Sequence, residues 1–188
     1  MKLLPTTLPE VIVVEPDVYA DERGCFSETW NASSFDGAGL PLRFVQCNHS
    51  YSTRGVLRGL HYQQPAPQGK LVRAITGEIF DVAVDLRRRS STFARWVGVT
   101  ISAANKHALW IPPGFAHGFY VLSPSADVVY LCTSPRVAAS EQTLRWDDPA
   151  LAIAWPLAGA PILSAKDARG VGLDQAVVYP DEPTLGPG

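Results

Sequence analysis

Turn residues recur at close, fairly regular intervals along this chain, and their spacing limits the fold more than any other feature of the sequence. Between the Gly, Pro, Asn and Asp residues lie short runs rich in Val, Ile, Phe and Tyr, which are typical of strands. This spacing favours an antiparallel sandwich or barrel over βαβ units, so we predict an all-β fold. The runs cover residues 11–14, 43–46, 56–61, 70–75, 79–86, 96–101, 108–111, 115–122 and 128–133.

The clearest alternation lies in residues 79–86, where period two sorts the side chains onto opposite sheet faces. Helical signals are weak elsewhere. One short helix is predicted within residues 28–36, with Asn31 or Ser33 as its cap, and a second near residues 140–144. The fold is therefore expected to hold only a few short helices.

The chain is predicted to form one domain. No internal repeat and no Gly/Ser linker divides it. Prolines recur after Trp155, so this tail is expected to wrap the surface as loops. The single domain, residues 1–188, comprises an N-terminal arm (1–39), a central β-structure (about 40–150) and a C-terminal wrap (151–188).

Composition limits the classes of partner that the protein is expected to bind and the cellular compartment in which it is expected to lie. The net charge of -2 gives no general attraction to nucleic acid or to an anionic membrane. Neither a signal peptide nor a run of about 18 apolar residues is present. Cys25, Cys47 and Cys132 form no CxxC pattern, so we expect free thiols in the reducing cytoplasm. Apolar residues make up 46% and charged residues 18%, so part of the apolar surface is expected in a subunit interface.

Arg58 and His61 stand three residues apart in one strand-like run. Positions three apart on a regular strand point to opposite faces. Gly59 between them permits a bulge or a close backbone approach, which would bring both side chains toward one cavity. Taken alone, however, such a histidine is more often a hydrogen-bonded structural residue than a catalyst.

Three other candidates are also ambiguous when each is taken alone. Lys70 at a strand start is usually solvated, and if it points inward it needs an anionic partner such as a substrate oxyanion. Tyr130 within a strand is usually part of the core. The neighbouring Lys166 and Asp167 in the tail resemble an ordinary surface pair.

Residues 111–119 include Pro112, Gly114 and His117 and resemble the second half-motif of cupins, P-x-G-x-x-H. The usual cupin metal site also takes an H-x-H pair from the first half. Here the matching stretch reads His61-Tyr62-Gln63, without the second histidine. Too few ligands remain for the usual site, so a cupin-type barrel without metal is favoured.

Together these segments resemble the dTDP-4-dehydrorhamnose 3,5-epimerase family, from about Val11 to Ala176. Each matching string alone is weak evidence for the family, but the presence of all of them in the same order is specific evidence for it. The strings lie at residues 21–24, 44–50, 56–63, 68–73, 80–87, 109–119, 145–149 and 163–167. The resemblance implies an all-β, cupin-type jelly-roll sandwich or barrel that forms a homodimer and needs neither metal nor other cofactor.

The resemblance also implies a reaction, in which dTDP-4-keto-6-deoxy-D-glucose is epimerised at C3 and C5 to dTDP-4-keto-L-rhamnose. The family's catalytic base matches His61, and the acid on the opposite face of the sugar matches Tyr130. The carboxylate that orients the base matches Asp167, and the cation near the carbonyl oxygen matches Lys70. In the family, N-terminal residues are exchanged between subunits. The substrate-binding positions match Arg23, Phe26, Glu28, Gln46, Asn48, Arg58, His117, Glu141 and Lys166, the first three serving the neighbour's site.

This chain differs from the usual family sequence at one place that concerns recognition of the nucleotide. After Thr133 the family usually has two tyrosines, one of which stacks on thymine, whereas this chain has Ser134-Pro135-Arg136. An arginine plane can also stack on a base.

Three alternatives to the double epimerase remain open at this point. The first is a mono-epimerase that acts at C3 or C5 of a related dTDP-4-keto deoxysugar, with the same histidine and tyrosine. The second is a metal-dependent cupin, which the missing H-x-H histidine argues against. The third is a non-catalytic sugar-nucleotide binding protein, which the joint retention of His61, Tyr130 and Asp167 argues against.

Overall fold

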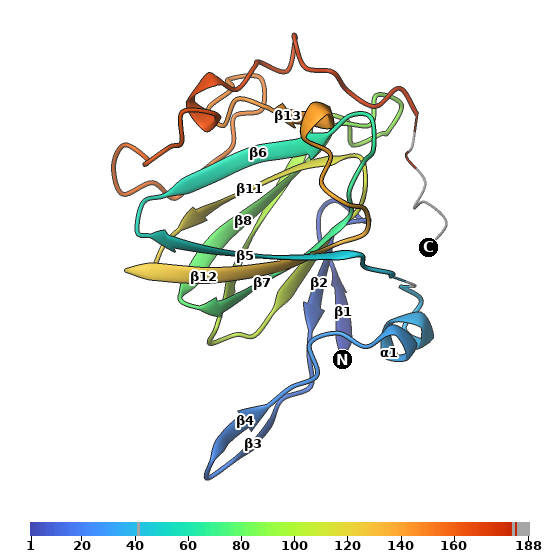
Figure 1. Ribbon diagram of the computed structural model, residues 1–188, viewed down its shortest axis with the longest axis vertical. Helices are drawn as coiled ribbons and strands as arrows, with labels where there is room; N and C mark the ends of the chain where they lie inside the picture. The colour runs from blue at the N-terminus through green and yellow to red at the C-terminus, as the bar shows by residue number, and fades with distance from the viewer. Residues whose placement is uncertain (41, 182, 184–188) are drawn as a thin grey trace.

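The computed structural model describes residues 1–40, 42–181 and 183, and β-strands dominate this part of the chain (Figure 1). The all-β prediction with a few short helices is confirmed. The helices are α1 (Ala32–Gly37) and the 3-10 turns η1 (Ala138–Ser140) and η2 (Asp167–Arg169). The strands are β1 (Lys2–Pro5), β2 (Ile12–Glu15), β3 (Tyr19–Asp21), β4 (Gly24–Phe26), β5 (Gln46–Thr53), β6 (Leu57–Gln63), β7 (Lys70–Thr76), β8 (Glu78–Asp85), β9 (Trp96–Ser102), β10 (Ala108–Ile111), β11 (Phe115–Val121), β12 (Ser125–Cys132) and β13 (Glu141–Thr143).

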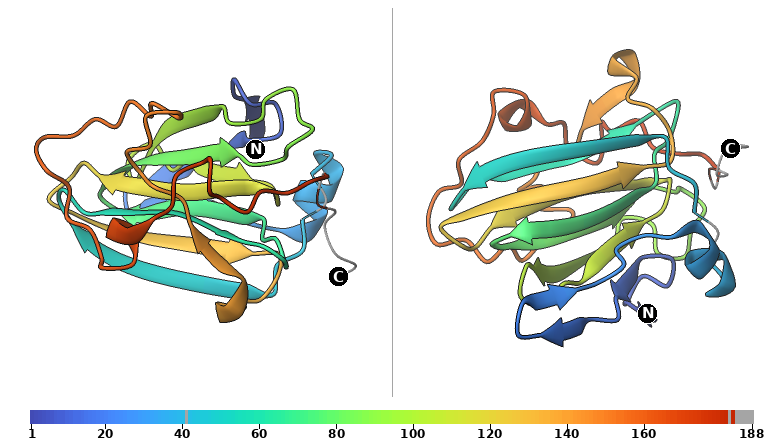
Figure 2. Two further views of the ribbon diagram at one scale, coloured as in Figure 1. Left: turned by 90° about the horizontal axis from the view of Figure 1, so that it is seen from above. Right: turned by 60° about the horizontal axis from the view of Figure 1, so that its bottom comes forward.

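Two antiparallel sheets face each other in the body of the molecule (Figure 2). One has the strand order β1-β2-β10-β7-β12-β5, and the other has the order β13-β6-β11-β8-β9. Apolar side chains of both sheets, among them Val72, Ala83, Phe119 and Val128, pack into one cluster. Burial of these side chains holds the sheets together.

The outer face of the five-stranded sheet is also covered. Val82 and Val84 of β8 pack there against Leu151 and Tyr179 of the C-terminal segment. Strand β8 therefore carries apolar side chains on both faces. Asp81 of this strand is buried and faces the space between the sheets.

The predicted short helix is present as α1 and begins four residues later than the start of the predicted stretch. Asn31 is its cap, since the side-chain oxygen accepts hydrogen bonds from the N–H groups of Ser33 and Ser34. Phe35 of α1 packs beside Trp110 of β10, which fixes the helix against the six-stranded sheet.

Within the predicted N-terminal arm, β1 and β2 extend the six-stranded sheet, and Val13 of β2 pairs with Leu109. One prediction about a local element is wrong. The helix expected near residues 140–144 is instead η1 followed by β13, whose Thr143 pairs with His61. The open edge of β6 satisfies the backbone groups of β13, and this pairing outweighs a weak local preference for helix.

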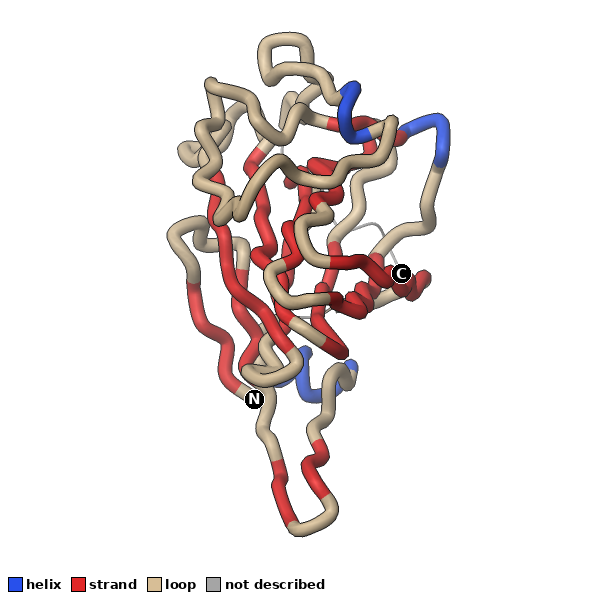
Figure 3. The backbone as a smooth tube through the Cα atoms, turned by 90° about the vertical axis from the view of Figure 1, so that its left-hand side faces the viewer, coloured by secondary structure: helices blue, strands red, loops and turns tan. Residues whose placement is uncertain are grey.

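Strands β3 and β4 form a hairpin that projects from the body (Figure 3). Tyr19 and Phe26 on this hairpin are 65% and 68% exposed. Such large apolar side chains are costly to leave in water, and their grouping is typical of an interaction surface.

Candidate active site

The bulge that Gly59 permits is present between β6 and β11. His61 pairs with His117 and Arg58 pairs with Phe119, so two residues of β6 stand opposite Gly118 alone. Gly59 has φ +118°, and a Cβ added there would lie 2.6 Å from the Gly118 Cα. The extra residue brings His61 and Arg58 to the same side of β6. Arg58 donates from Nε to the Ser52 hydroxyl of β5 (2.9 Å) but does not line the cavity around His61.

A buried carboxylate holds the imidazole of His61. Nε2 of His61 lies 2.5 Å from Oδ1 of Asp167, the first residue of η2. Ser164 holds the backbone of Asp167 in turn, because its Oγ accepts from the Asp167 N–H at 3.1 Å. Burial alone would raise the pKa of Asp167, but its hydrogen bonds to His61 and Ser164 hold it below the ordinary value. An ionised Asp167 keeps the proton on Nε2 and leaves the Nδ1 lone pair of His61 to accept another.

Tyr130 and Lys70 belong to the sheet opposite His61. Tyr130 lies on β12 and Lys70 on β7, and both line the same cavity as His61. Burial raises the pKa of the Tyr130 hydroxyl, which keeps the proton on its oxygen. Burial lowers the pKa of Lys70, and this effect is partly opposed by electrostatic interactions with Cys132 and Asp81. The cavity thus has a proton acceptor on one wall, and a proton donor and the Lys70 amine on the other.

His117 lies deeper and does not line this cavity. Its Nε2 is 2.7 Å from Oδ1 of Asp81, and both residues are buried. Burial lowers the pKa of His117, an effect that the Asp81 charge opposes. The sequence reasoning missed Asp81 as a partner of His117 and Ser164 as a partner of Asp167. Alternation along residues 79–86 could have indicated Asp81, whereas nothing in the sequence pattern singled out Ser164.

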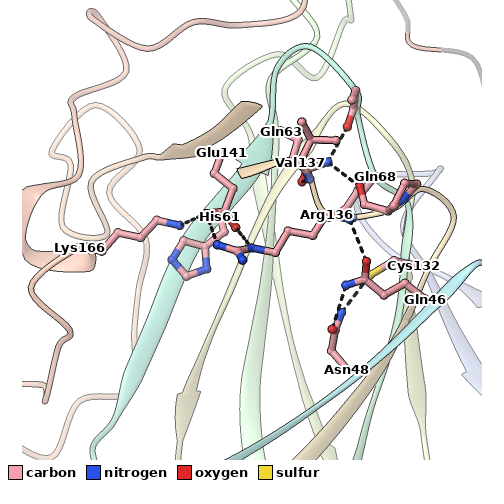
Figure 4. A network of polar contacts seen from close by, with 12 residues as sticks. Gln46, Asn48, His61, Gln63, Gln68, Cys132, Arg136, Val137, Glu141 and Lys166 are labelled. Carbon is pink, nitrogen blue, oxygen red and sulfur yellow. Dashed lines mark hydrogen bonds and ion pairs between the residues drawn. The ribbon is translucent and has the colours of Figure 1, made fainter. Parts of the chain in front are cut away.

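An ion-pair chain includes two residues that line the cavity, Arg136 and Glu141, and continues to Lys166 (Figure 4). Arg136 donates to both carboxylate oxygens of Glu141, from Nε at 2.7 Å and from Nη2 at 2.9 Å. Lys166 donates to the same carboxylate at 3.1 Å. The hydrogen bond from Arg136, with the help of Lys166, lowers the pKa of Glu141 to about 2. Beside them, Gln46 donates to the Asn48 side chain at 2.9 Å.

The other three expected binding residues lie outside this cavity. Arg23 and Phe26 are exposed on the projecting hairpin, where Arg23 pairs with Asp21. Glu28 follows the hairpin and accepts from Asn31 and Ser34 near the start of α1. Within one protomer, therefore, the predicted site is assembled without its N-terminal part.

Among the residues that the structure describes, no three His, Cys, Asp or Glu side chains are grouped so that they could hold a metal ion. Over the same residues, no helix is long and apolar enough to cross a membrane. The three cysteines are free thiols, two of them exposed and Cys132 buried.

Comparison with known proteins decides the family. A family model described as dTDP-4-dehydrorhamnose 3,5-epimerase matches residues 5–175. The chain belongs to the dTDP-4-dehydrorhamnose 3,5-epimerase family. A member from Pseudomonas aeruginosa is 53% identical, over 96% of this chain and 100% of its own, and one from Salmonella typhimurium is 50% identical, over 95% and 98%.

Solved structures of the family agree with the fold described above. The dTDP-6-deoxy-D-glucose-3,5-epimerase from Legionella pneumophila, in complex with dTDP-4-keto-L-rhamnose, superposes with a TM-score of 0.93. It is 47% identical, and the match covers 97% of this chain and 99% of that one. A 3'-monoepimerase from Streptomyces bikiniensis is more distant, at 35% identity and a TM-score of 0.85, over 90% of this chain and 86% of its own. The cupin-type jelly roll expected from the sequence is confirmed.

Proposed function

We propose that this protein converts dTDP-4-keto-6-deoxy-D-glucose into dTDP-4-keto-L-rhamnose by epimerising C3 and C5. Membership of the family supports an isomerase of this kind. One observation carries the proposal: two facing sheets line the same cavity and each supplies a candidate group. His61, held by Asp167, lies on one sheet, and Tyr130 lies on the other. The two relatives named above as 3,5-epimerases are 53% and 50% identical, whereas the named mono-epimerase is 35% identical, which favours inversion at both carbons.

The first step in this proposal is removal of a proton next to the C4 ketone. A C–H bond at C3 or C5 becomes acidic because its electron pair can move onto O4 as an enolate. His61 takes the proton on Nδ1, and the Asp167 carboxylate stabilises the imidazolium that forms. Lys70, as the buried cation on the facing wall, stabilises the negative charge on O4.

The second step returns a proton to the opposite face. Tyr130 carries this proton, and its raised pKa keeps it in the acid form until the enolate is present. A base alone would return the proton to the face from which it came, so inversion requires both walls. The cavity residues Gln46, Asn48 and Glu141 are assigned to binding of the nucleotide sugar. Lys166, which donates to Glu141 from outside the cavity lining, is assigned to the same role.

A homodimer completes the site in this proposal. Arg23, Phe26 and Glu28 lie on or just after a projecting hairpin, away from the cavity of their own protomer. We assign them to the cavity of the neighbouring subunit. The exposed apolar side chains of the hairpin support this assignment because contact with a partner would remove them from water. The same proposal includes a single-domain organisation and a cytoplasmic location. The three free thiols support the cytoplasmic location.

Turnover in D2O with NMR detection tests the function. The wild-type protein, given dTDP-4-keto-6-deoxy-D-glucose, is expected to form dTDP-4-keto-L-rhamnose with deuterium at both C3 and C5. Deuterium at one carbon only would replace the proposal with a mono-epimerase. An unchanged substrate without deuterium would contradict epimerisation altogether.

A further inference from the structure

Cys132 is the last residue of β12 and is buried, and the proposed reaction steps do not use it. It pairs with Gln46 of β5 on one side and with Lys70 of β7 on the other. Paired residues of antiparallel strands point to the same face of a sheet, so Cys132 faces inward with these two cavity residues. The thiol therefore lies beside the cavity lining, although it is not part of it.

A chain of hydrogen bonds ends at the sulfur of Cys132 (Figure 4). The backbone N–H of Arg136 donates to Gln46 Oε1 at 2.8 Å. Gln46 Nε2 donates to Asn48 Oδ1 at 2.9 Å, and Asn48 Nδ2 donates to Cys132 Sγ at 3.5 Å. The chain thus joins two side chains that line the cavity to one that is buried beside it.

The first donor fixes the direction of this chain. A backbone N–H can only donate, so the side-chain oxygen of Gln46 must accept and its nitrogen must donate. For the same reason, the Asn48 amide has its oxygen toward Gln46 and its nitrogen toward Cys132. If the sulfur is removed, Asn48 Nδ2 loses its acceptor on the side of the buried thiol, and one contact holds the amide in place of two.

A thiol suits this position because Lys70 is its neighbour. Burial raises the pKa of the Cys132 thiol, which keeps it neutral. A neutral acceptor serves Asn48 without pairing with the Lys70 ammonium, whereas a carboxylate here would form an ion pair with it. The proposed cation for O4 is thereby left without a competing anion at this position.

We propose that Cys132 is a positioning residue for the nucleotide sugar, which acts by holding the Asn48 amide in one orientation at the cavity wall. This inference rests on the proposed function, in which Asn48 binds the substrate. Gln46 fixes the oxygen side of the amide and Cys132 its nitrogen side. One hydrogen on Asn48 Nδ2 and one lone pair on Oδ1 then remain for the substrate.

Two small substitutions separate the acceptor from the volume of the side chain. Cys132→Ala and Cys132→Ser leave nearly the same space, but only serine offers an acceptor, which a small shift of the Asn48 amide reaches. Cys132→Ala is expected to raise KM for the nucleotide sugar about fivefold while kcat stays within about twofold of wild type. Cys132→Ser is expected to keep KM within about twofold. A wild-type KM in Cys132→Ala overturns the proposal, and so does an equal rise in both variants, which would indicate packing alone.

A double-mutant cycle tests whether Cys132 acts through Asn48. Asn48→Ala alone is expected to raise KM about tenfold, and adding Cys132→Ala should change that value by no more than about twofold. Independent effects would multiply to a rise of about fiftyfold in the double variant. That outcome would overturn the role assigned to the thiol.

Cys47→Ala is the matched control. Cys47 lies on β5 between Gln46 and Asn48, but it is exposed and does not line the cavity. Its removal is expected to leave KM unchanged. A rise as large as that in Cys132→Ala would contradict the assignment of the effect to the buried thiol.

Binding of dTDP-D-glucose gives a measurement that needs no turnover, because this sugar lacks the C4 ketone that makes the neighbouring C–H bonds acidic. Calorimetry is expected to show a Kd about fivefold higher in Cys132→Ala than in wild type, and a Kd within about twofold of wild type in Cys132→Ser. Equal Kd values in the three proteins overturn the inference. If the expected difference is found but wild-type protein does not epimerise dTDP-4-keto-6-deoxy-D-glucose, the proposed function is contradicted and the inference stands.

Discussion

A single hydrogen bond joins His61 to Asp167, which are 106 residues apart in the chain. Neither residue has an unusual sequence context, and each alone suits a structural role better than a catalytic one. Their chemistry arises from the pairing, because the buried carboxylate fixes the imidazole tautomer and stabilises its charged form. Ser164 holds Asp167 in place through the backbone, a contact that no sequence pattern indicated.

Asp167→Asn is expected to keep the fold and lose most of the activity. The amide is nearly the same size but carries no charge, so it neither enforces the tautomer nor stabilises the imidazolium. We expect kcat to fall roughly 10²- to 10⁴-fold, measured by the formation of dTDP-4-keto-L-rhamnose. Asp147→Asn, which changes an exposed carboxylate paired with Arg145 outside the cavity, is the control and should retain wild-type kcat. Similar rates in the two variants would disprove the role of Asp167.

Secondary-structure elements set the distances between the reacting groups. The direction in which His61 points depends on the bulge in β6. From Gly59, the sequence indicated that a bulge or a close backbone approach is allowed here. It predicted most strands to within a few residues, because alternation and turn residues are local signals. It did not predict β13 or the addition of β1 and β2 to the sheet. Those strands are short, and their pairing depends on partners far away in the chain.

Gly59→Ala is expected to destabilise the protein and disturb the site. The positive φ is unfavourable for alanine, and the new Cβ would collide with the backbone at Gly118. We expect a loss of about 2–4 kcal/mol in the free energy of unfolding, measured by urea titration. Gly37→Ala is the control, because a Cβ there meets nothing within 4 Å, and its effect should stay within about 0.5 kcal/mol. Equal stabilities for the two variants would contradict the close approach at the bulge.

At the scale of the whole molecule, one protomer holds the proposed base, acid and cation but only part of the predicted binding residues. The hairpin of β3 and β4 carries Arg23 and Phe26 away from the body (Figure 3). The family resemblance predicted this separation through subunit exchange, which composition and periodicity alone could not do. A dimer in which hairpins are exchanged accounts for both the exposed aromatic rings and the incomplete site.

Subunit mixing tests this arrangement. Arg23→Ala lacks a working hairpin and His61→Ala lacks the base, so each homodimer should be nearly inactive. Random exchange makes half of the dimers mixed, each with one complete site, so about a quarter of the wild-type activity is expected in an equal mixture. Light scattering checks that the dimers form. Activity in the mixture no greater than the sum of the separate variants would contradict the exchange of hairpins.

The central claim is that a base and an acid act from opposite sheets, and the fate of deuterium in Tyr130→Phe tests it most directly. With the acid removed, His61 should still take a proton from the sugar, exchange it with D2O and return deuterium to the same face. NMR is therefore expected to show deuterated but uninverted substrate with Tyr130→Phe, and neither exchange nor inversion with His61→Ala. Inversion by Tyr130→Phe at the wild-type rate, or exchange by His61→Ala, would contradict the account.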